Sequence, residues 1–289
     1  MKALVFGKTG QVARELAHLA PEMDIEAECL GREQADLTNL TALTEAIEAT
    51  DASIIVNAAA YTAVDQAEDE PELAHKVNAL APEAMAKAAA ARGLPFLHIS
   101  TDYVFEGAPG DPKTEIDPTG PTTEYGRSKL AGEKAVATSG ADAVILRTAW
   151  VFSVHGKNFL KTMLNVGKGR DEMRVVGDQH GQPTAARDIA RALWTIAGAY
   201  EVGRGQPGTF HFASQPATTW AGFASAIFER AGWAPGETPK VTAIETHEWP
   251  TKAARPADSV LDCSAIMAAY GIDQPDWHAS LDEAIRELT

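Results

Sequence analysis

The chain has 289 residues, a formal net charge of −15 and two cysteines, Cys29 and Cys263. This length can bury a full hydrophobic core without disulfides, so we expect one large α/β domain, or a larger domain that carries a smaller one, in the cytoplasm. The negative charge opposes binding to nucleic acid, and no segment approaches the ~18 uninterrupted apolar residues of a membrane span, so neither is a predicted partner.

The first half of the chain alternates apolar strands with helices. Residues 2–6 form an apolar run that ends at Gly7, which predicts a buried strand and a turn, and Val12, Leu16 and Leu19 then recur at helical spacing. Further strands are predicted over 25–30, 53–56, 95–100 and 144–147, and helices over 40–49 and 71–92 and around Tyr125. Such alternation implies right-handed crossovers and a parallel sheet with helices on both faces. The predicted fold class is α/β, with a doubly wound, Rossmann-type sheet.

The regular alternation weakens after Trp150. Residues 177–183 read as a turn and 209–213 as a strand, and helices are predicted over 185–200, 219–232 and 276–288. We expect a smaller substrate-binding lobe that is interleaved with the first domain. The dinucleotide-binding domain would comprise 1–149 and about 184–212, and the lobe about 150–183 and 213–289.

The turn after the first strand carries a glycine fingerprint. Gly7, Gly10 and Ala13 are spaced by two residues each, directly between a strand and a helix. Gly7 would permit the tight turn, Gly10 would let the backbone approach a pyrophosphate, and the small Ala13 would let helix and strand pack closely. An ordinary strand-to-helix turn is the alternative reading.

The choice of coenzyme depends on the end of the second strand. Enzymes that prefer NAD usually carry an acidic residue about 20 residues beyond the first glycine, where this chain has Arg32. NADPH should therefore be accepted as well as NADH, although Arg32 could equally be a solvated surface residue. Asp36 and Leu37 are expected beside the adenine, and small side chains leave room for the cofactor at the third strand, at Ala58, Ala59 and Ala60.

Tyr125 and Lys129 are four residues apart, so they project from the same face of one helix. The lysine is expected to lower the pKa of the phenol and so let Tyr125 pass a proton to a developing alkoxide. Thr101 ends the fourth strand, where doubly wound folds bind ligands, and could donate a hydrogen bond to the substrate oxygen. An exposed helix pair is the alternative for Tyr125 and Lys129.

These motifs resemble the extended short-chain dehydrogenase/reductase superfamily and, within it, the dTDP-4-dehydrorhamnose reductase family, over nearly the whole chain. The similar segments are 6–12, 57–65, 100–105, 125–129, 178–184, 255–256 and 275–277. The resemblance implies NAD(P)H-dependent reduction of the 4-keto group of a dTDP-linked 6-deoxyhexose, which gives dTDP-L-rhamnose. It implies catalysis by Thr101, Tyr125 and Lys129, sugar contacts from Asp102, Tyr103 and Trp150, and cofactor contacts from Gly10, Gln11, Val12, Asp36, Leu37, Ala59 and Ala60.

Two of the expected substrate contacts have alternatives. An aromatic side chain such as Trp150 suits the apolar face of a 6-deoxy sugar, but Trp150 could also be a core residue. Arg255 could meet a substrate phosphate or form a surface salt bridge.

Some members of the family bind Mg²⁺ at a dimer interface through a glutamate on the first helix and acids on a later one. Glu15 matches the first, but the later pair is Arg187-Asp188 here, so a cation replaces one ligand. We therefore predict no metal site, with Glu15 as a solvated helix residue, and leave a homodimer open.

Three other functions compete with a reductase. A dehydratase would carry Glu where this chain has Tyr103, so an elimination would lack its base. A 4-epimerase would recycle its nicotinamide instead of consuming it, and a non-catalytic NAD(P)-binding regulatory subunit would not need the intact Thr101, Tyr125 and Lys129.

Overall fold

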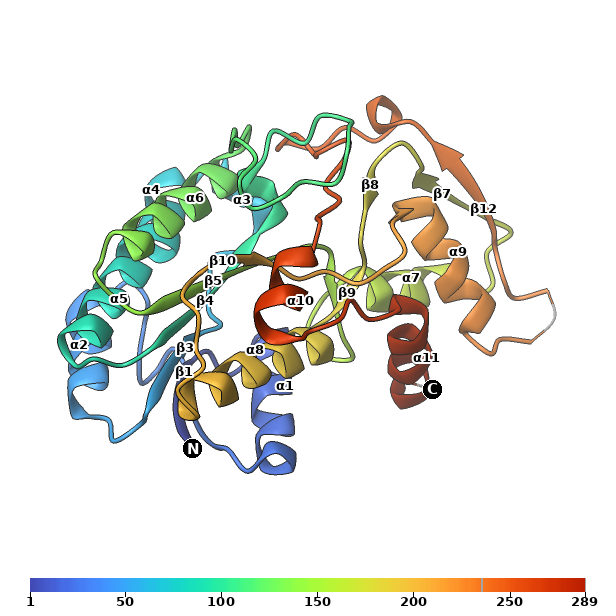
Figure 1. The fold of residues 1–289 in the computed structure, drawn as a ribbon. Coiled ribbons are helices and arrows are strands. Elements are labelled where there is room, and N and C mark those ends of the chain that lie inside the picture. The colour runs from blue at the N-terminus through green and yellow to red at the C-terminus, as the bar shows by residue number, and fades with distance from the viewer. Residues whose placement is uncertain (235, 289) are drawn as a thin grey trace.

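The central sheet has six parallel strands. The structure is a computed structural model that describes residues 1–234 and 236–288, and its strand order is β10-β5-β4-β3-β1-β2 (Figure 1). The strands are β1 (Lys2–Phe6), β2 (Glu26–Leu30), β3 (Ile54–Asn57), β4 (Phe96–Thr101), β5 (Ala143–Thr148) and β10 (Gly208–His211). The predicted doubly wound α/β fold is confirmed.

Helices cover both faces of this sheet. Ala3 and Val5 of β1 belong to one buried cluster, and Leu4 and Phe6 belong to another on the opposite face. Because both faces are covered, β1 is a continuous apolar run and does not alternate with polar residues. The first face carries α1 (Gln11–Leu19), α8 (Ala186–Glu201) and α10 (Ser264–Tyr270); the second carries α2 (Leu40–Ala49), α5 (Ala81–Ala91) and α6 (Glu124–Ala137).

The chain reverses its direction of winding at β1. This strand pairs with β2 on one side and with β3 on the other. In doubly wound sheets a ligand crevice forms at the carboxyl ends of the strands at such a switch point. The Gly7 turn follows β1 and Ala58 follows β3, so both lie at this crevice.

The predicted helix over 71–92 contains a π-helical turn. It consists of α4 (Pro71–His75), the π turn Lys76–Leu80 and α5. Pro82 has no N–H to give to the carbonyl of Asn78 four residues earlier. That carbonyl instead lies against α6, where a Cβ on Gly132 would be only 2.0 Å from its oxygen. The π turn thus allows α6 to approach closely.

A separate buried cluster lies around α7, α9 and α11. Leu160, Phe223 and Trp277 are among its members, and α9 also packs against a two-stranded parallel ribbon, β7 with β12. Sequence patterns predicted α9 and α11 but missed α7, β7, β12 and α10. The elements are α7 (Phe159–Gly167), α9 (Trp220–Arg230), α11 (Trp277–Leu288), β7 (Glu172–Val176) and β12 (Lys240–Ile244).

The boundary between domain and lobe stays a prediction. Leu261 and Ile266 fall in the range assigned to the lobe, yet they pack in the cluster of the central sheet. The remaining elements are short, namely α3 (Val64–Ala67), β6 (Val151–Phe152), β8 (His180–Gly181), β9 (Thr184–Ala185), β11 (Thr218–Thr219) and the 3₁₀ turns Ala20–Met23, Asp102–Val104 and Thr246–Glu248. None of the helices in the described ranges has the length and apolar character needed to cross a bilayer.

Candidate active site

The turn after β1 packs as a dinucleotide fingerprint requires. Gly7 has a φ of 129°, and a Cβ at this position would be 3.1 Å from the Cβ of Ala13 and 3.3 Å from the carbonyl of Ala58. Gly10 precedes α1 with extended backbone, and no described side chain caps this helix. Its first backbone N–H groups therefore remain for an anionic group, which fits the pyrophosphate of NAD(P)H.

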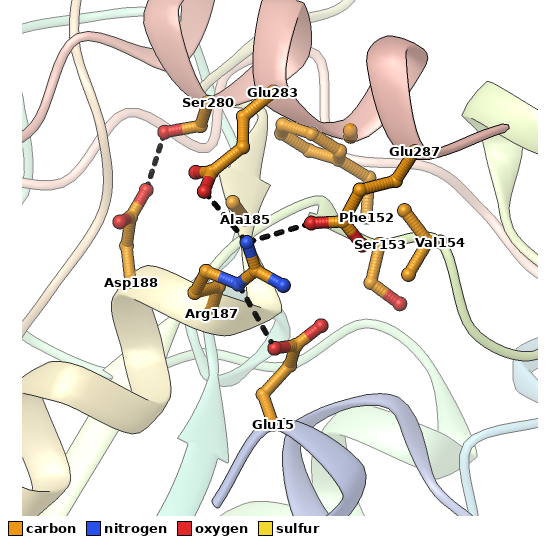
Figure 2. A pocket seen from close by; sticks show the side chains of 11 residues that line it. Glu15, Phe152, Ser153, Val154, Ala185, Arg187, Asp188, Ser280, Glu283 and Glu287 are labelled. Carbon is orange, nitrogen blue, oxygen red and sulfur yellow. Dashed lines mark hydrogen bonds and ion pairs between the residues drawn. The ribbon is translucent and has the colours of Figure 1, made fainter. Parts of the chain in front are cut away.

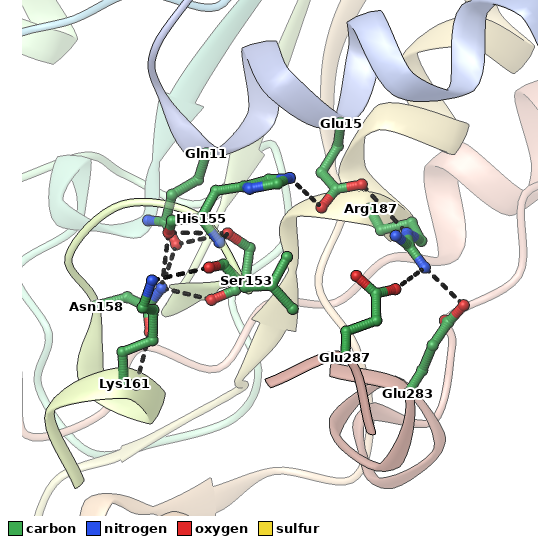
Figure 3. Close-up of polar contacts among 10 residues, drawn as sticks. Gln11, Glu15, Ser153, His155, Asn158, Lys161, Arg187, Glu283 and Glu287 are labelled. Carbon is green, nitrogen blue, oxygen red and sulfur yellow. Dashed lines mark hydrogen bonds and ion pairs between the residues drawn. The ribbon is translucent and has the colours of Figure 1, made fainter. Parts of the chain in front are cut away.

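Gln11 directs its side chain away from this turn. Its Oε1 accepts hydrogen bonds from Asn158 Nδ2 at 2.8 Å and from Ser153 Oγ at 3.2 Å (Figure 3). Val12 beside it is buried. The cofactor contact expected of Gln11 and Val12 would therefore come from their backbone N–H groups and not from their side chains.

The end of β2 carries an ion pair. Arg32 Nε lies 3.0 Å from Asp36 Oδ2, and the Arg32 side chain is 84% exposed. Hydrogen bonds from the backbone N–H of Thr38 and from Arg32 lower the pKa of Asp36 to about 2. Leu37 packs against the buried cluster beneath. Arg32 thus projects into solvent, and its two predicted roles, a 2′-phosphate contact and a solvated surface residue, both stay predictions.

The end of β3 is held by a polar side chain. Ala58 N–H donates to Phe6 O at 2.9 Å, and Ala59 N–H donates to Asn57 Oδ1 at 3.1 Å. Asn57 Nδ2 lies 3.1 Å from His98 Nδ1, while Ala60 is exposed. These hydrogen bonds fix the backbone of Ala58 and Ala59, two of the small residues expected to leave room for the cofactor.

Thr101, Tyr125 and Lys129 all lie against the carboxyl-terminal part of β4. The cap of α6 is Thr123, whose Oγ1 accepts from Gly126 N–H at 3.0 Å. Lys129 is 2% exposed, and its Nζ donates to Ile99 O on β4 at 2.7 Å. Tyr125 is also buried and lies in hydrogen-bonding reach of the Thr101 side chain. The pair therefore faces the sheet, and the alternative of an exposed helix pair is wrong.

Burial dominates the protonation of these groups. It raises the pKa of Tyr125 to about 12, although the hydrogen bond with Thr101 acts in the opposite direction. It lowers the pKa of Lys129 to about 8, against the attraction of Glu133. The expectation that Lys129 lowers the Tyr125 pKa is therefore wrong for the protein alone, because the ammonium is bonded to Ile99 and the phenol has lost water.

His98 is a member of the site that the sequence patterns missed. It is buried in the middle of β4, with Nδ1 toward Asn57 and Nε2 at 3.4 Å from Lys129 Nζ. Burial, and then the charge of Lys129, lower its pKa well below the usual value, so the imidazole is neutral. The signal in the sequence was an ionisable residue between the apolar Leu97 and Ile99 of a predicted strand.

The expected sugar contacts surround the same edge. Asp102 is buried, accepts a hydrogen bond from Thr101 Oγ1 at 2.8 Å, and has its pKa raised to about 6 by burial. The ring of Tyr103 meets that of Tyr125 edge-on, with centroids 5.5 Å apart.

Trp150 follows β5 by two residues, and β5 pairs with β4 up to Thr101. Its ring stacks on Trp220 at 3.6 Å and covers Gly181, where a Cβ would be 2.3 Å from the indole. It is half-buried and also packs against the core cluster of the central sheet, so the sugar contact and the core role of Trp150 both stay predictions.

Arg255 already has a carboxylate partner. Its Nη2 lies 2.6 Å from Asp65 Oδ2, and the guanidinium is partly covered. Of the two expectations for Arg255, a salt bridge is present. A phosphate contact would have to be shared with Asp65.

Comparison with known proteins identifies the family. Residues 1–289 match the family model for the RmlD substrate binding domain. The chain belongs to this family. A dTDP-4-dehydrorhamnose reductase of Burkholderia thailandensis is 43% identical over 296 residues, covering 100% of this chain and 99% of the relative. The corresponding protein of Escherichia coli K12 is 40% identical over 296 residues, with 100% and 98% covered.

Solved structures of RmlD-family proteins agree. A dTDP-4-dehydrorhamnose reductase of Clostridium acetobutylicum superposes with a TM-score of 0.91 at 37% identity, covering 100% of this chain and 99% of that one. One from Bacillus anthracis in complex with NADP gives 0.89 at 32% identity, with 99% of each chain covered. A UDP-glucose 4-epimerase of Thermus thermophilus, 19% identical with a TM-score of 0.80 over 99% and 98% of the two chains, shares the fold.

Glu15, the glutamate on the first helix, forms an ion pair with Arg187. Glu15 is 2% exposed and its Oε2 lies 3.1 Å from Arg187 Nε, so the expectation of a solvated residue is wrong (Figure 2). No group of three or more His, Cys, Asp or Glu residues in the described ranges is arranged to hold a metal ion. The residues present do not fit Mg²⁺, because a guanidinium lies where the carboxylates converge.

Proposed function

We propose that the protein catalyses the NAD(P)H-dependent reduction of the C4 ketone of dTDP-4-dehydro-L-rhamnose to give dTDP-L-rhamnose. The names of the full-length relatives support this substrate, and the NADP complex of a structural neighbour supports the coenzyme. The observation that carries the proposal is that Tyr125 lies in hydrogen-bonding reach of Thr101 at the carboxyl end of β4, with Lys129 buried one helical turn away and bonded to Ile99 O.

The chemistry of the site follows from its protonation states. Bound NAD(P)H supplies the hydride. A proton donor must hold its proton until it is needed, and the high pKa of Tyr125 keeps the phenol protonated at neutral pH. Tyr125 donates that proton to the C4 oxygen, which becomes the product hydroxyl. Thr101 would turn the hydroxyl proton that it donates to Asp102 Oδ1 in the free protein toward the same oxygen, and Lys129 adds positive charge near the developing alkoxide.

The other contacts are proposals that rest on position. Gly7, Gly10 and the backbone of Gln11 and Val12 would hold the pyrophosphate, and Arg32 would meet the 2′-phosphate of NADPH. Asp36, Leu37 and Ala58 to Ala60 would line the adenosine side. Asp102, Tyr103 and Trp150 would contact the sugar, and Arg255 the diphosphate.

The decisive experiment supplies the purified protein with the dTDP-4-keto-6-deoxy sugar, its 3,5-epimerase and NADPH, and follows the absorbance of the reduced cofactor. We expect one cofactor oxidised per sugar converted, with dTDP-L-rhamnose as the product. Conversion of the sugar without net consumption of the cofactor would indicate an epimerase. A lack of turnover in both the parent and Tyr125→Phe would indicate a binding subunit.

Two further properties remain predictions, namely a cytoplasmic location and a homodimer. Light scattering of the purified protein at several concentrations tests the second.

A further inference from the structure

Three carboxylates surround one guanidinium outside the catalytic edge. Arg187 lies in the first turn of α8, with its side chain 16% exposed. Its Nε lies 3.1 Å from Glu15 Oε2 on α1, and its Nη1 lies 2.6 Å from Glu283 Oε1 and 2.7 Å from Glu287 Oε1 on α11 (Figure 2). Glu283 and Glu287 are one turn apart, so α11 presents both to the same cation.

Glu15 depends on this arrangement more than its two counterparts do. Its side chain is 2% exposed, whereas those of Glu283 and Glu287 are 40% and 39% exposed. A buried carboxylate needs a counter-charge. The other neighbour of Glu15 is His155, with Nε2 at 3.4 Å from Oε1, which is charged only when protonated. Arg187 is therefore the permanent counter-charge, because a guanidinium does not lose its proton in proteins.

Two successive turns of α1, the helix after the glycine turn, are linked to the elements around the buried cluster of α7, α9 and α11. Gln11 accepts hydrogen bonds from Ser153 and Asn158, and Glu15, four residues later, is joined through Arg187 to α11 (Figure 3). The first turn of α1 is the proposed pyrophosphate site, so the same helix touches the cofactor and the substrate side.

We propose that the Arg187 side chain takes the place of a divalent metal ion between α1 and α11. The ion pairs of Arg187 would then hold the predicted substrate-binding lobe, which contains α11, in place against α1. Within the proposed function, Arg187 is a positioning residue. Its single positive charge offsets that of the buried Glu15 and lies where a hard cation would otherwise bring the three carboxylates together.

The test compares thermal unfolding of the full chain in EDTA and in millimolar Mg²⁺ at matched ionic strength. The variants are Arg187→Met, which keeps the apolar stem, and the control Arg191→Met on the same helix, whose side chain is 50% exposed and pairs with Asp188. We expect the parent to unfold at the same temperature in both buffers. Arg187→Met should unfold about 6–15 °C lower in EDTA, because Glu15 is left buried and unpaired, and Mg²⁺ should raise its Tm.

A second variant keeps the test decisive if Arg187→Met folds poorly. Arg187→Met combined with Glu15→Gln removes both buried charges and should recover most of the lost Tm. A parent Tm that falls in EDTA, an Arg187→Met that matches the Arg191→Met control, or a variant that Mg²⁺ does not stabilise would each overturn the proposal.

Kinetics distinguish the junction from the proposed function. In the reductase assay Arg187→Met should raise the KM for the sugar while the pH profile of kcat is unchanged, since Tyr125 and Lys129 are intact. If the parent itself turns over no sugar, the proposed function fails, and the unfolding measurements still decide the role of Arg187.

Discussion

Replacing Lys129 by Met should stabilise the fold while it impairs catalysis. Burial lowers the pKa of Lys129 from 10.5 to about 8, so the charged form costs about 3 kcal/mol in the folded protein at neutral pH. The variant loses the hydrogen bond to Ile99 O, at 2.7 Å, which is worth about 1–2 kcal/mol. The net gain is about 1–2 kcal/mol, which corresponds to a Tm higher by roughly 2–8 °C.

The stability difference between Lys129→Met and the parent should depend on pH. Between about pH 8 and pH 10.5 the unfolded parent holds the Lys129 proton and the folded parent does not. The stability of the parent therefore rises with pH across that window, because the cost of the buried Lys129 charge is lost. The advantage of Lys129→Met is complete below about pH 8 and shrinks toward pH 10.5.

The measurement is thermal or denaturant unfolding of parent and variant across this pH range, together with kcat at neutral pH. The exposed Lys134 on the same helix provides a matched control, Lys134→Met, which should change stability by less than about 0.5 kcal/mol. We expect kcat of Lys129→Met to fall about 10²–10³-fold. A variant that unfolds below the parent at neutral pH, or an advantage that does not shrink in alkali, would refute the reasoning.

Three further changes test the site and its packing. Tyr125→Phe should lower kcat about 10²–10⁴-fold at unchanged KM for NADPH, because the proton donor is lost; activity within tenfold of the parent would exclude that role. Arg32→Ala should raise the KM for NADPH but not for NADH, and an unchanged ratio would reject a 2′-phosphate contact. Gly132→Ala should cost about 1–3 kcal/mol of unfolding free energy, because its Cβ would be 2.0 Å from Asn78 O. Gly198→Ala, with nothing within 4 Å in a helix, should instead be neutral or stabilising by about 0.5–1 kcal/mol, and equal effects would contradict the packing argument.

The sheet and the catalytic pair were predictable because their signals are local. The apolar run 2–6 ending at Gly7 and the four-residue spacing of Tyr125 and Lys129 each fix a geometry within one element. The ribbon of β7 and β12 gave no such signal, because most of its residues are partly or fully exposed and its strands are 68 residues apart, as the register of Lys240 with Glu172 shows.

Contacts between distant segments explain the errors at the site. Glu15 looks solvated in its own helix, and only Arg187, 172 residues later, reveals why it can be buried. The prediction that Lys129 lowers the pKa of Tyr125 was wrong for a related reason. Sequence spacing correctly placed an ammonium on the same helix face, but it could not show that Ile99 would bind that ammonium or that the phenol would lose its water.

One physical cause accounts for the shifted groups at the carboxyl edge. Burial disfavours charge, so it raises the pKa of Tyr125 to about 12 and of Asp102 to about 6, and it lowers the pKa of Lys129 to about 8. A ketone reduction begins with a neutral carbonyl and creates an alkoxide, so the charge that the reaction develops is negative. The retained phenol proton is transferred to that alkoxide, and the poorly solvated ammonium is stabilised when the negative charge appears. The site therefore holds the Lys129 ammonium in a state that burial disfavours and that the negative charge of the reaction stabilises, which is why removing the ammonium should stabilise the fold and slow the chemistry.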